Sequence, residues 1–478
     1  MNKGVEEQLL SHSSAIASGI ASQLHAIGGA LRSELPSPRR AVKIAAGLGG
    51  PTFALWLAGG AAAGGLGLLA LAAAVTAFRR PYLLGPFVAL LLPFGDRIEI
   101  LHVQVAPLEA AIGGGAIGYV ARLAMRHDEL RFRSFHWIFA FLVVFIGLST
   151  LGPAGSGQLH EFLLWGALGC VCHAVTTYVD NRRNVRLLLV GIAVPTLVEA
   201  ALAFFEYIDS WSQRFSRLNG AIVYPLPKGT LNHANALAQF LVLASLAIFA
   251  LVLAERGLPR RCGLVAAGAG GLALVVTFSR ASWIAFAVGV CVYLIERKIR
   301  ARVVTAGAVI AGVAAVLALV VRGAIGERIS SLFTASRLSS FRIELWAKAA
   351  HISGAHPLTG SGHFREVGIY AGRPDVATHP HNLFLGLAVF FGIPAAVAFA
   401  GLVLVALRAT WRGSRQASAP ARLVALGFLA LLVAFLVNGV FEYPFWNLSL
   451  TTLVVLLLAV SVTLDRRPSE ARELLVRR

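Results

Sequence analysis

The stretch that decides the fold is ANALAQFLVLASLAIFALVLA, residues 234–254, which contains no charged side chain. A helix of this length crosses the roughly 30 Å hydrocarbon core of a bilayer. Lipid offers the backbone no hydrogen-bond partners, so a helix must satisfy its own N–H and C=O groups. The apolar residues run without period-two alternation, which argues against a strand of a membrane barrel. The stretch is therefore predicted to be a transmembrane helix.

Similar apolar runs recur along the chain, in which 57% of residues are hydrophobic and only 14% are charged. A soluble domain carries about 25% charged residues. The sequence therefore predicts an all-α polytopic membrane protein with about 12–14 spans. The number is given as a range because the first three runs are short or glycine-rich. The candidate spans are 44–60, 61–78, 81–95, 106–124, 134–151, 161–179, 187–206, 234–254, 263–279, 281–296, 303–321, 382–407, 422–440 and 446–464.

The chain carries 42 Lys and Arg against 23 Asp and Glu, a net charge of +19. In a soluble protein this excess would suggest nucleic acid as a partner, but here the basic clusters recur after every second candidate span. The positive-inside rule places them in the cytoplasm. The clusters are Arg39, Arg40 and Lys43; Arg79 and Arg80; Arg122 to Arg133; Arg182, Arg183 and Arg186; Arg256, Arg260 and Arg261; Arg297, Lys298, Arg300 and Arg302; Arg408 to Arg422; and the tail after Asp465.

This orientation divides the chain into three parts. Residues 1–43 are predicted to be a cytoplasmic tail that lies near membrane lipids, 44–464 the membrane domain, and 465–478 a second cytoplasmic tail. The four cysteines lie in or beside apolar runs and are interpreted as small hydrophobes, not as disulfides or metal ligands. We predict no nucleic-acid partner.

The longest outward segment, 322–381, is predicted to be a loop and breaks the charge pattern. It carries seven Arg and Lys residues, and guanidinium groups bind phosphate oxygens in pairs. The alternative is a solvated loop with incidental arginines. It also contains His351, His356, His363, His379 and His381, and histidine is the side chain best suited to act as a base near neutral pH. No carboxylate–histidine helix motif or outward Asp-x-Asp accompanies them, so no metal site is predicted.

Three shorter outward segments add candidate residues. Arg280 lies at a turn between two apolar runs and either faces a polar cavity or reaches the outer headgroups. Asn232 and Asn235 open a helix, where they either cap it or help its N-terminus to bind an anion. Glu442, in the last outward loop, either orients His381 or an arginine or is a solvated acid in an aromatic interface belt.

Four motifs in this order resemble the family of O-antigen ligases and O-antigen polymerase-like membrane glycosyltransferases. They cover roughly residues 215 to 395, and their order and spacing carry the resemblance. They are Arg217 followed by Gly229-Thr230, Asn232 and Asn235; Ser279-Arg280; Arg342-Ile-Glu-Leu-Trp346 running on to His356-Pro-Leu-Thr-Gly-Ser-Gly362; and His379-Pro-His381-Asn382 followed by Phe391-Gly-Ile393.

The resemblance implies transfer of a glycan from undecaprenyl pyrophosphate to lipid A-core at the periplasmic face of the bacterial inner membrane. It further implies a metal-independent, inverting reaction without cofactors and a fold of the C type among membrane glycosyltransferases. His381 matches the family's catalytic base, and Arg280 and Arg342 match the arginines that hold the pyrophosphate. Substrate-binding roles are expected for Arg217, Asn232, Asn235, His379, Asn382 and Glu442.

Two other transferases share the pattern, namely an O-antigen polymerase and a protein O-oligosaccharyltransferase using the same donor. From a different class, a transporter or flippase of a lipid-linked anion would show ionisable residues at mid-span depth and internal symmetry. The spans after residue 230 are almost free of mid-depth charge. This argues against the transporter, whereas the resemblance alone barely separates the three transferases, among which we expect the ligase.

Overall fold

The computed structural model describes residues 62–100, 103–126, 132–153, 155–179, 181–209, 217–218, 221–222, 226–301, 303–305, 308, 312, 336–363, 379–416 and 418–465. The chain divides into two compact units, Met1–Gly67 and Leu68–Arg478. In the first unit, the described residues belong to the start of an apolar helix, Ala62–Arg79. The predicted tail 1–43, the span 44–60 and most of the span 303–321 lie outside the described residues, as does the C-terminal tail after Asp465.

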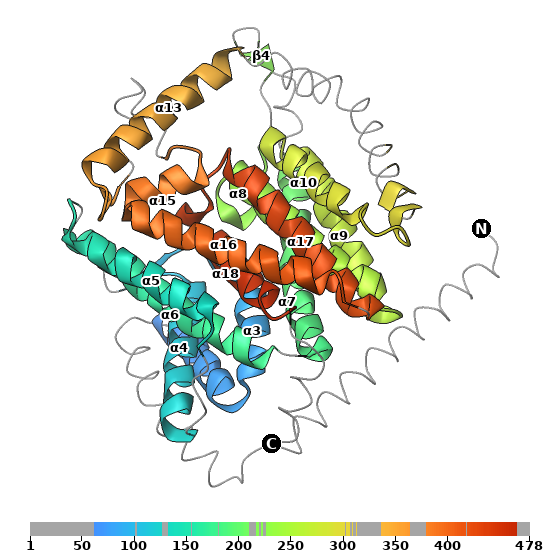
Figure 1. The fold of residues 1–478 in the computed structure, drawn as a ribbon, viewed down its shortest axis with the longest axis horizontal. Coiled ribbons are helices and arrows are strands. Elements are labelled where there is room, and N and C mark those ends of the chain that lie inside the picture. The colour runs from blue at the N-terminus through green and yellow to red at the C-terminus, as the bar shows by residue number, and fades with distance from the viewer. Residues whose placement is uncertain are drawn as a thin grey trace, which may run out of the picture. The chain divides into compact units, whose positions relative to one another are not determined.

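The second unit is built of helices, which confirms the all-α prediction (Figure 1). Two antiparallel ribbons, β1 (Ile98–Ile100) with β2 (Val103–Val105) and β3 (Arg217–Leu218) with β4 (Ala221–Ile222), are small additions. The main described helices are α3 (Leu84–Leu90), α4 (Pro107–Arg126), α5 (Ser134–Leu148), α6 (Leu159–Tyr178), α7 (Arg182–Asp209), α8 (Ala234–Ala254), α9 (Leu258–Val276), α10 (Arg280–Tyr293), α13 (Ser336–Ala355), α15 (Leu383–Phe391), α16 (Ile393–Gly413), α17 (Ala419–Gly439) and α18 (Leu448–Ser461).

Seven described helices are long and apolar enough to cross a membrane, and each lies on a predicted span. Large apolar side chains such as Phe141 and Val144 of α5 are exposed, as expected for a surface that faces lipid. The chain is therefore a multi-pass membrane protein. The seven are Ala62–Arg79, Ser134–Leu151, Leu159–Tyr178, Arg182–Asp209, Ala234–Ala254, Ile393–Gly413 and Ala419–Gly439, and three shorter apolar helices are Pro81–Leu90, Arg280–Tyr293 and Leu448–Ser461.

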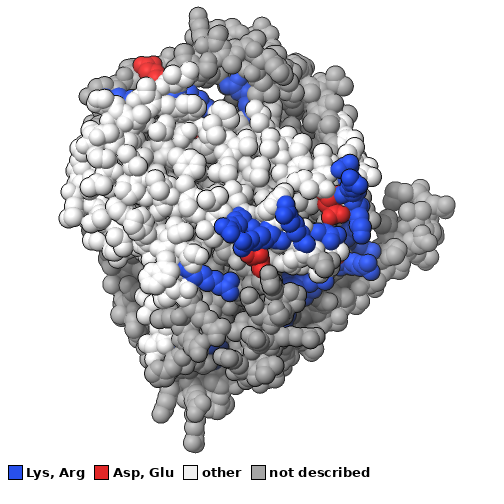
Figure 2. Space-filling view, in the orientation of Figure 1, with Lys and Arg blue, Asp and Glu red and all other residues white. Residues whose placement is uncertain are grey.

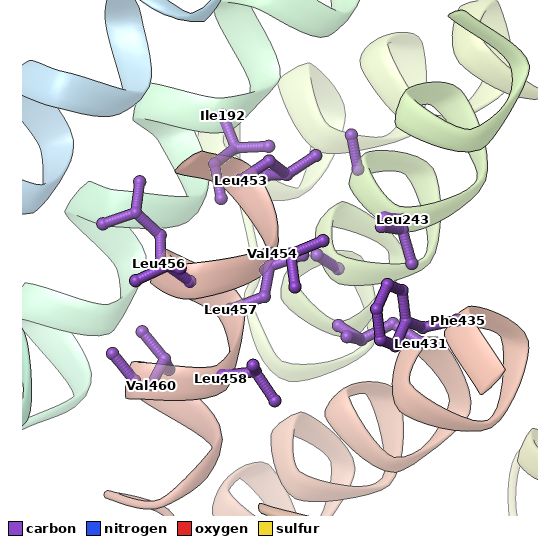
Figure 3. Close-up of a cluster of buried hydrophobic side chains, with 14 of the residues drawn as sticks. Ile192, Leu243, Leu431, Phe435, Leu453, Val454, Leu456, Leu457, Leu458 and Val460 are labelled. Atoms are coloured by element: carbon purple, nitrogen blue, oxygen red, sulfur yellow. The ribbon is translucent and has the colours of Figure 1, made fainter. Parts of the chain in front are cut away.

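The centre of the second unit is formed by α8 and α18, which are apolar on all sides and almost wholly buried. Leu453, Val454 and Leu457 of α18 pack against Ile192 of α7, Leu243 of α8 and side chains of α17 (Figure 3). The N-terminal ends of α8 and α18 lie close together, because the side chain of Asn447, just before α18, donates to the carbonyl of Leu231, just before α8. The packing of these two helices therefore fixes the positions of the loops that precede them, from which the site is built.

The predicted span 382–407 is wrong as a single helix, because the structure breaks it into α15 and α16 at Gly392. Gly392 has φ +92, a conformation that glycine adopts most easily, and Pro394 starts the next helix. The freed N–H of Ile393 donates to the carbonyl of Pro357 at 2.8 Å. A short α15 is thus held against the segment that follows α13.

The predicted long loop 322–381 contains a 20-residue helix, α13, which the sequence analysis missed. Its Leu345, Ala349 and Ile352 share one face and pack on Val389 of α15. After α13, Gly360 approaches α15 so closely that a Cβ would lie 2.6 Å from the carbonyl carbon of Phe390. The motif around Gly360 therefore docks α13 onto α15 and fixes the position of Arg342.

Candidate active site

Glu442 is the centre of a polar cluster that joins four segments of the chain. Its side chain is almost fully buried after α17. His381 Nδ1 lies 3.0 Å from Glu442 Oε2, and Asn235 Nδ2 donates to Oε1 at 2.7 Å. Arg342 Nη2 of α13 forms an ion pair with Oε1 at 3.8 Å. Of the two sequence interpretations of Glu442, the geometry supports contact with both the histidine and an arginine.

His381 is held on both sides by its neighbours in the chain. Its backbone N–H donates to Nδ1 of His379 at 3.2 Å, and the indole of Trp346 donates to the carbonyl of Pro380 at 3.0 Å. A carboxylate only accepts, so the contact with Glu442 places the His381 proton on Nδ1 and leaves a lone pair on Nε2. The side chain is 20% exposed, which keeps it accessible to a substrate.

Asn382 stabilises the start of α15. Its side-chain oxygen accepts from the backbone N–H groups of Phe384 and Leu385, so it is the N-cap of α15. Its amide nitrogen donates to the carbonyl of Val440 at 3.3 Å, beside the loop that carries Glu442. Asn382 thus ties the start of α15 to the Glu442 loop.

Arg342 and Arg280 bring two positive charges to this cluster. The Arg342 guanidinium lies over the ring of Phe441, 5.6 Å from its centre. Burial lowers the pKa of Arg342, the Glu442 carboxylate opposes that shift, and the charge of Arg280 lowers the pKa further. The two guanidinium charges repel each other, so an anion that contacts both would be stabilised.

Arg280 reaches this place because of the turn before it. Phe278 has φ +54, Ser279 is the N-cap residue, and α10 begins at Arg280, as the predicted turn requires. Asn438 at the end of α17 donates to Ser282 Oγ at 2.9 Å. This bond joins the first turn of α10 to the helix that leads to Glu442.

Neither Asn232 nor Asn235 caps α8, so the capping interpretation is wrong. His233 caps the helix, because its Nδ1 accepts the backbone N–H of Asn235 at 3.2 Å. Asn235 is thereby free to contact Glu442, and Asn232, with φ +59, donates to Asp96 at 2.6 Å. The capping role of His233 was missed, since histidine is not among the common cap residues.

Two carboxylates of α7, also missed, hold the turn before His233. Glu206 accepts from the backbone N–H groups of Lys228 at 2.6 Å and Gly229 at 3.1 Å. The fully buried Glu199 accepts from both the backbone N–H and the hydroxyl of Thr230. Of Arg217, only the backbone is described, in β3 opposite Ile222.

Among the described residues, three non-glycine residues have positive φ: Asn232, Phe278 and His381. Each lies in a segment that carries a candidate side chain: Asn235, Arg280 and His381, respectively. Such conformations cost on the order of 1–3 kcal/mol and persist where the surrounding structure imposes them. Their coincidence with the predicted motifs marks this cluster as the candidate active site.

His379 lies behind His381 and is 6% exposed. Its ring is stacked on Trp446, with centroids 6.0 Å apart and planes 18° from parallel. Burial lowers its pKa well below 6.5, and the neighbouring His381, His233 and Arg342 lower it further. His379 is therefore a neutral support for His381.

His379, His381 and Glu442 also offer ligand atoms within 4.8 Å of one another, a grouping that could hold a metal ion. In the structure, however, Nδ1 of each histidine already has a partner, the N–H of His381 for one and the Glu442 carboxylate for the other. A metal bound at these Nδ1 atoms would have to replace both contacts, whereas one bound at Nε2 would not, so a transfer assay with chelator present separates a hydrogen-bonded cluster from a metal centre.

The fold and the site together define a multi-pass membrane protein whose loops gather a histidine, a carboxylate and arginines at one place. Residues 263–400, which include Arg280, Arg342 and His381, match the family model described as O-antigen ligase. This match confirms the resemblance to that family. No curated protein matches the chain. The family implies a ligase- or polymerase-type glycosyltransferase that acts on lipid-linked glycans among membrane lipids.

Proposed function

We propose that this protein transfers a glycan from undecaprenyl pyrophosphate to the sugar of lipid A-core, at the periplasmic face of the bacterial inner membrane. The observation that carries the proposal is the contact of His381 with Glu442 at 3.0 Å, with Arg342 on the other carboxylate oxygen. Donor and acceptor are both bound to the membrane, so a shared site removes much of the entropic cost of bringing them together.

In this proposal His381 is the general base. Its Nε2 takes the proton of the acceptor hydroxyl as that oxygen attacks the anomeric carbon of the donor sugar. The bond from the anomeric carbon to the pyrophosphate oxygen breaks, and the pyrophosphate leaves with the electron pair, so the configuration inverts. Glu442 keeps the His381 proton on Nδ1 and stabilises the imidazolium that forms.

Arg342 and Arg280 would act on the leaving group. Negative charge grows on the pyrophosphate as the bond breaks, so cations placed there stabilise the transition state more than the bound substrate. A guanidinium forms paired hydrogen bonds with phosphate oxygens, which supports a metal-independent reaction. Binding of an anion would also relieve the repulsion between the two arginines.

The test uses the full-length protein in proteoliposomes with an undecaprenyl pyrophosphate glycan and, in separate arms, lipid A-core, free repeat unit or peptide as acceptor. We expect transfer to lipid A-core with chelator present, and its loss in His381→Ala. His351→Ala, an exposed histidine of α13, is the matched control. Wild-type turnover by His381→Ala would remove the proposed base, and activity that chelator abolishes and metal restores would make the cluster a metal centre.

A further inference from the structure

Beside the candidate active site lies a second cavity of about 480 Å³, which is within the range of small-molecule sites. It is lined by the residues before β1, the first two turns of α4 and α6, the residues before α8, the end of α15, and the segment from Tyr443 to Thr451, which includes the first turn of α18. His381, Glu442 and Arg342 do not line it. Two residues connect the cavity to the candidate active site. Trp446 lines the cavity and stacks on His379, and Asn232 lines the cavity and precedes His233 in the chain.

The charges around this cavity are wrong for a pyrophosphate. Asp96, Glu109 and Glu161 line it, against Arg97, which is already paired with Glu109 at 3.1 Å. His160, next to Arg97, also contacts Glu109 at 3.2 Å. Carboxylates repel phosphate but accept hydrogen bonds from hydroxyl and amino groups. The lining therefore fits a ligand with several such donors.

The cavity is also lined by aromatic side chains. The ring of Trp446 is 39% exposed, whereas Tyr443 beside it is buried. Phe390 and Phe445 are the other aromatic residues of the lining. The aromatic side chains offer flat apolar surface, and the carboxylates of the same lining offer hydrogen-bond acceptors. A sugar ring matches both, because its C–H faces are apolar and its rim carries hydroxyl groups.

We propose that this cavity is a sugar-binding subsite, which takes a neutral or amino sugar ring of one of the two glycan substrates. The inference rests on the proposed function and deepens it: the arginines hold the pyrophosphate, and the Trp446 cavity holds a ring of the glycan. The ring belongs either to the donor's glycan or to the acceptor's sugar chain, and the same hydroxyl and C–H chemistry serves both.

Binding is tested without turnover, by saturation-transfer NMR on the full-length protein in nanodiscs. The probes are the methyl glycosides of glucose and N-acetylglucosamine, with inorganic pyrophosphate as competitor. Leu164→Trp places an indole in the cavity, while Leu163→Trp, at a neighbouring side chain that is 60% exposed and does not line the cavity, is the matched control. We expect wild type and Leu163→Trp to give ring-proton signals that Leu164→Trp loses and pyrophosphate leaves unchanged.

An equal signal in Leu164→Trp, displacement by pyrophosphate, or no signal in wild type overturns the subsite. These results do not depend on transfer, so a failed subsite is distinguishable from a failed transferase.

A second variant, Asp96→Asn, removes a charge yet keeps an oxygen to accept from Asn232. In a transfer assay we expect Leu164→Trp and Asp96→Asn to raise KM about tenfold or more for one substrate. A rise for the donor or for the acceptor identifies whose ring is bound, and unchanged values for both overturn the proposal.

Discussion

At the scale of single residues, the assignment of Glu442 changes most between sequence and structure. The sequence leaves two interpretations of Glu442 open, a partner of His381 or an arginine and a solvated acid in an aromatic belt, because the residues it contacts in the structure include two that are 61 and 207 positions away. The motifs around His381 and Arg342 were predictable, since local spacing carries them. The contact between His381 and Glu442, on which the proposed role of His381 as a base rests, is visible only in the structure, where helix packing brings the two loops together.

Replacing Glu442 tests this contact. In Glu442→Gln the amide can donate to Nδ1 of His381 and so favours the tautomer with the proton on Nε2, which cannot accept the acceptor's proton. We expect kcat for transfer to fall about 100-fold or more, with the protein still folded. Glu255→Gln, at a carboxylate paired with Arg182 away from the site, is the control. Near-normal kcat in Glu442→Gln would show that the carboxylate does not orient His381.

His379 predicts a dependence of stability on pH. Its pKa in the folded protein is lowered well below 6.5, chiefly by burial. Between that pKa and 6.5 the unfolded chain binds a proton that the folded chain does not, so unfolding is favoured as pH falls. The stability is therefore complete above pH 6.5 and declines below it. His233, whose pKa burial also lowers, acts in the same direction.

The measurement is the thermal unfolding midpoint in detergent between pH 7.5 and 5.5. Wild type should lose stability on acidification, and His379→Phe should lose less, because the phenyl ring keeps the contact with Trp446 and does not titrate. The exposed His351→Phe should keep the wild-type slope. Identical slopes in all three proteins would mean that His379 does not carry the effect.

At the scale of elements, hydropathy predicted the long apolar helices that face lipid or form the core, but it did not predict the helices that position the site. The span 234–254 was predicted to the residue, because a run that is apolar on all sides has one stable environment. The break at Gly392 and the helix α13 were missed. Both depend on contacts between α13 and α15, and the mixed composition of α13 resembles a loop.

Gly392→Ala tests the break. Gly392 has φ +92, and an added Cβ would lie 2.3 Å from the carbonyl oxygen of Leu358, so the backbone that docks α13 must shift. We expect a loss of thermal stability and of transfer together, because Arg342 is displaced. The size should exceed the roughly 1 kcal/mol of an ordinary helix-propensity change. Gly354→Ala, which would meet nothing within 4 Å in α13, should be neutral or stabilising.

At the scale of the whole molecule, the charge pattern bears on the orientation of the site. Figure 2 shows most of the visible Lys and Arg side chains in one band at the lower right of the view and a few more near the upper edge, with a broad area without charged residues between them. Exposed basic residues follow α10 and α16, among them Arg297, Lys298 and Arg415. Hydropathy and the positive-inside rule predict that these basic clusters lie between spans and on the cytoplasmic side, since both rules depend on local composition alone.

The same rule puts Lys228, and with it the segment that carries His233 and Asn235, on the outer side. Single cysteines at two exposed positions test this on a background in which Cys170, Cys172, Cys262 and Cys291 are replaced by Ala. In intact spheroplasts a membrane-impermeant maleimide should label Lys228→Cys, whereas Arg297→Cys should react only after permeabilisation. Lys228 is suitable because its side chain is exposed while its backbone N–H makes the bond to Glu206. The reverse labelling would place the His381 cluster on the cytoplasmic side, where no periplasmic acceptor could reach it.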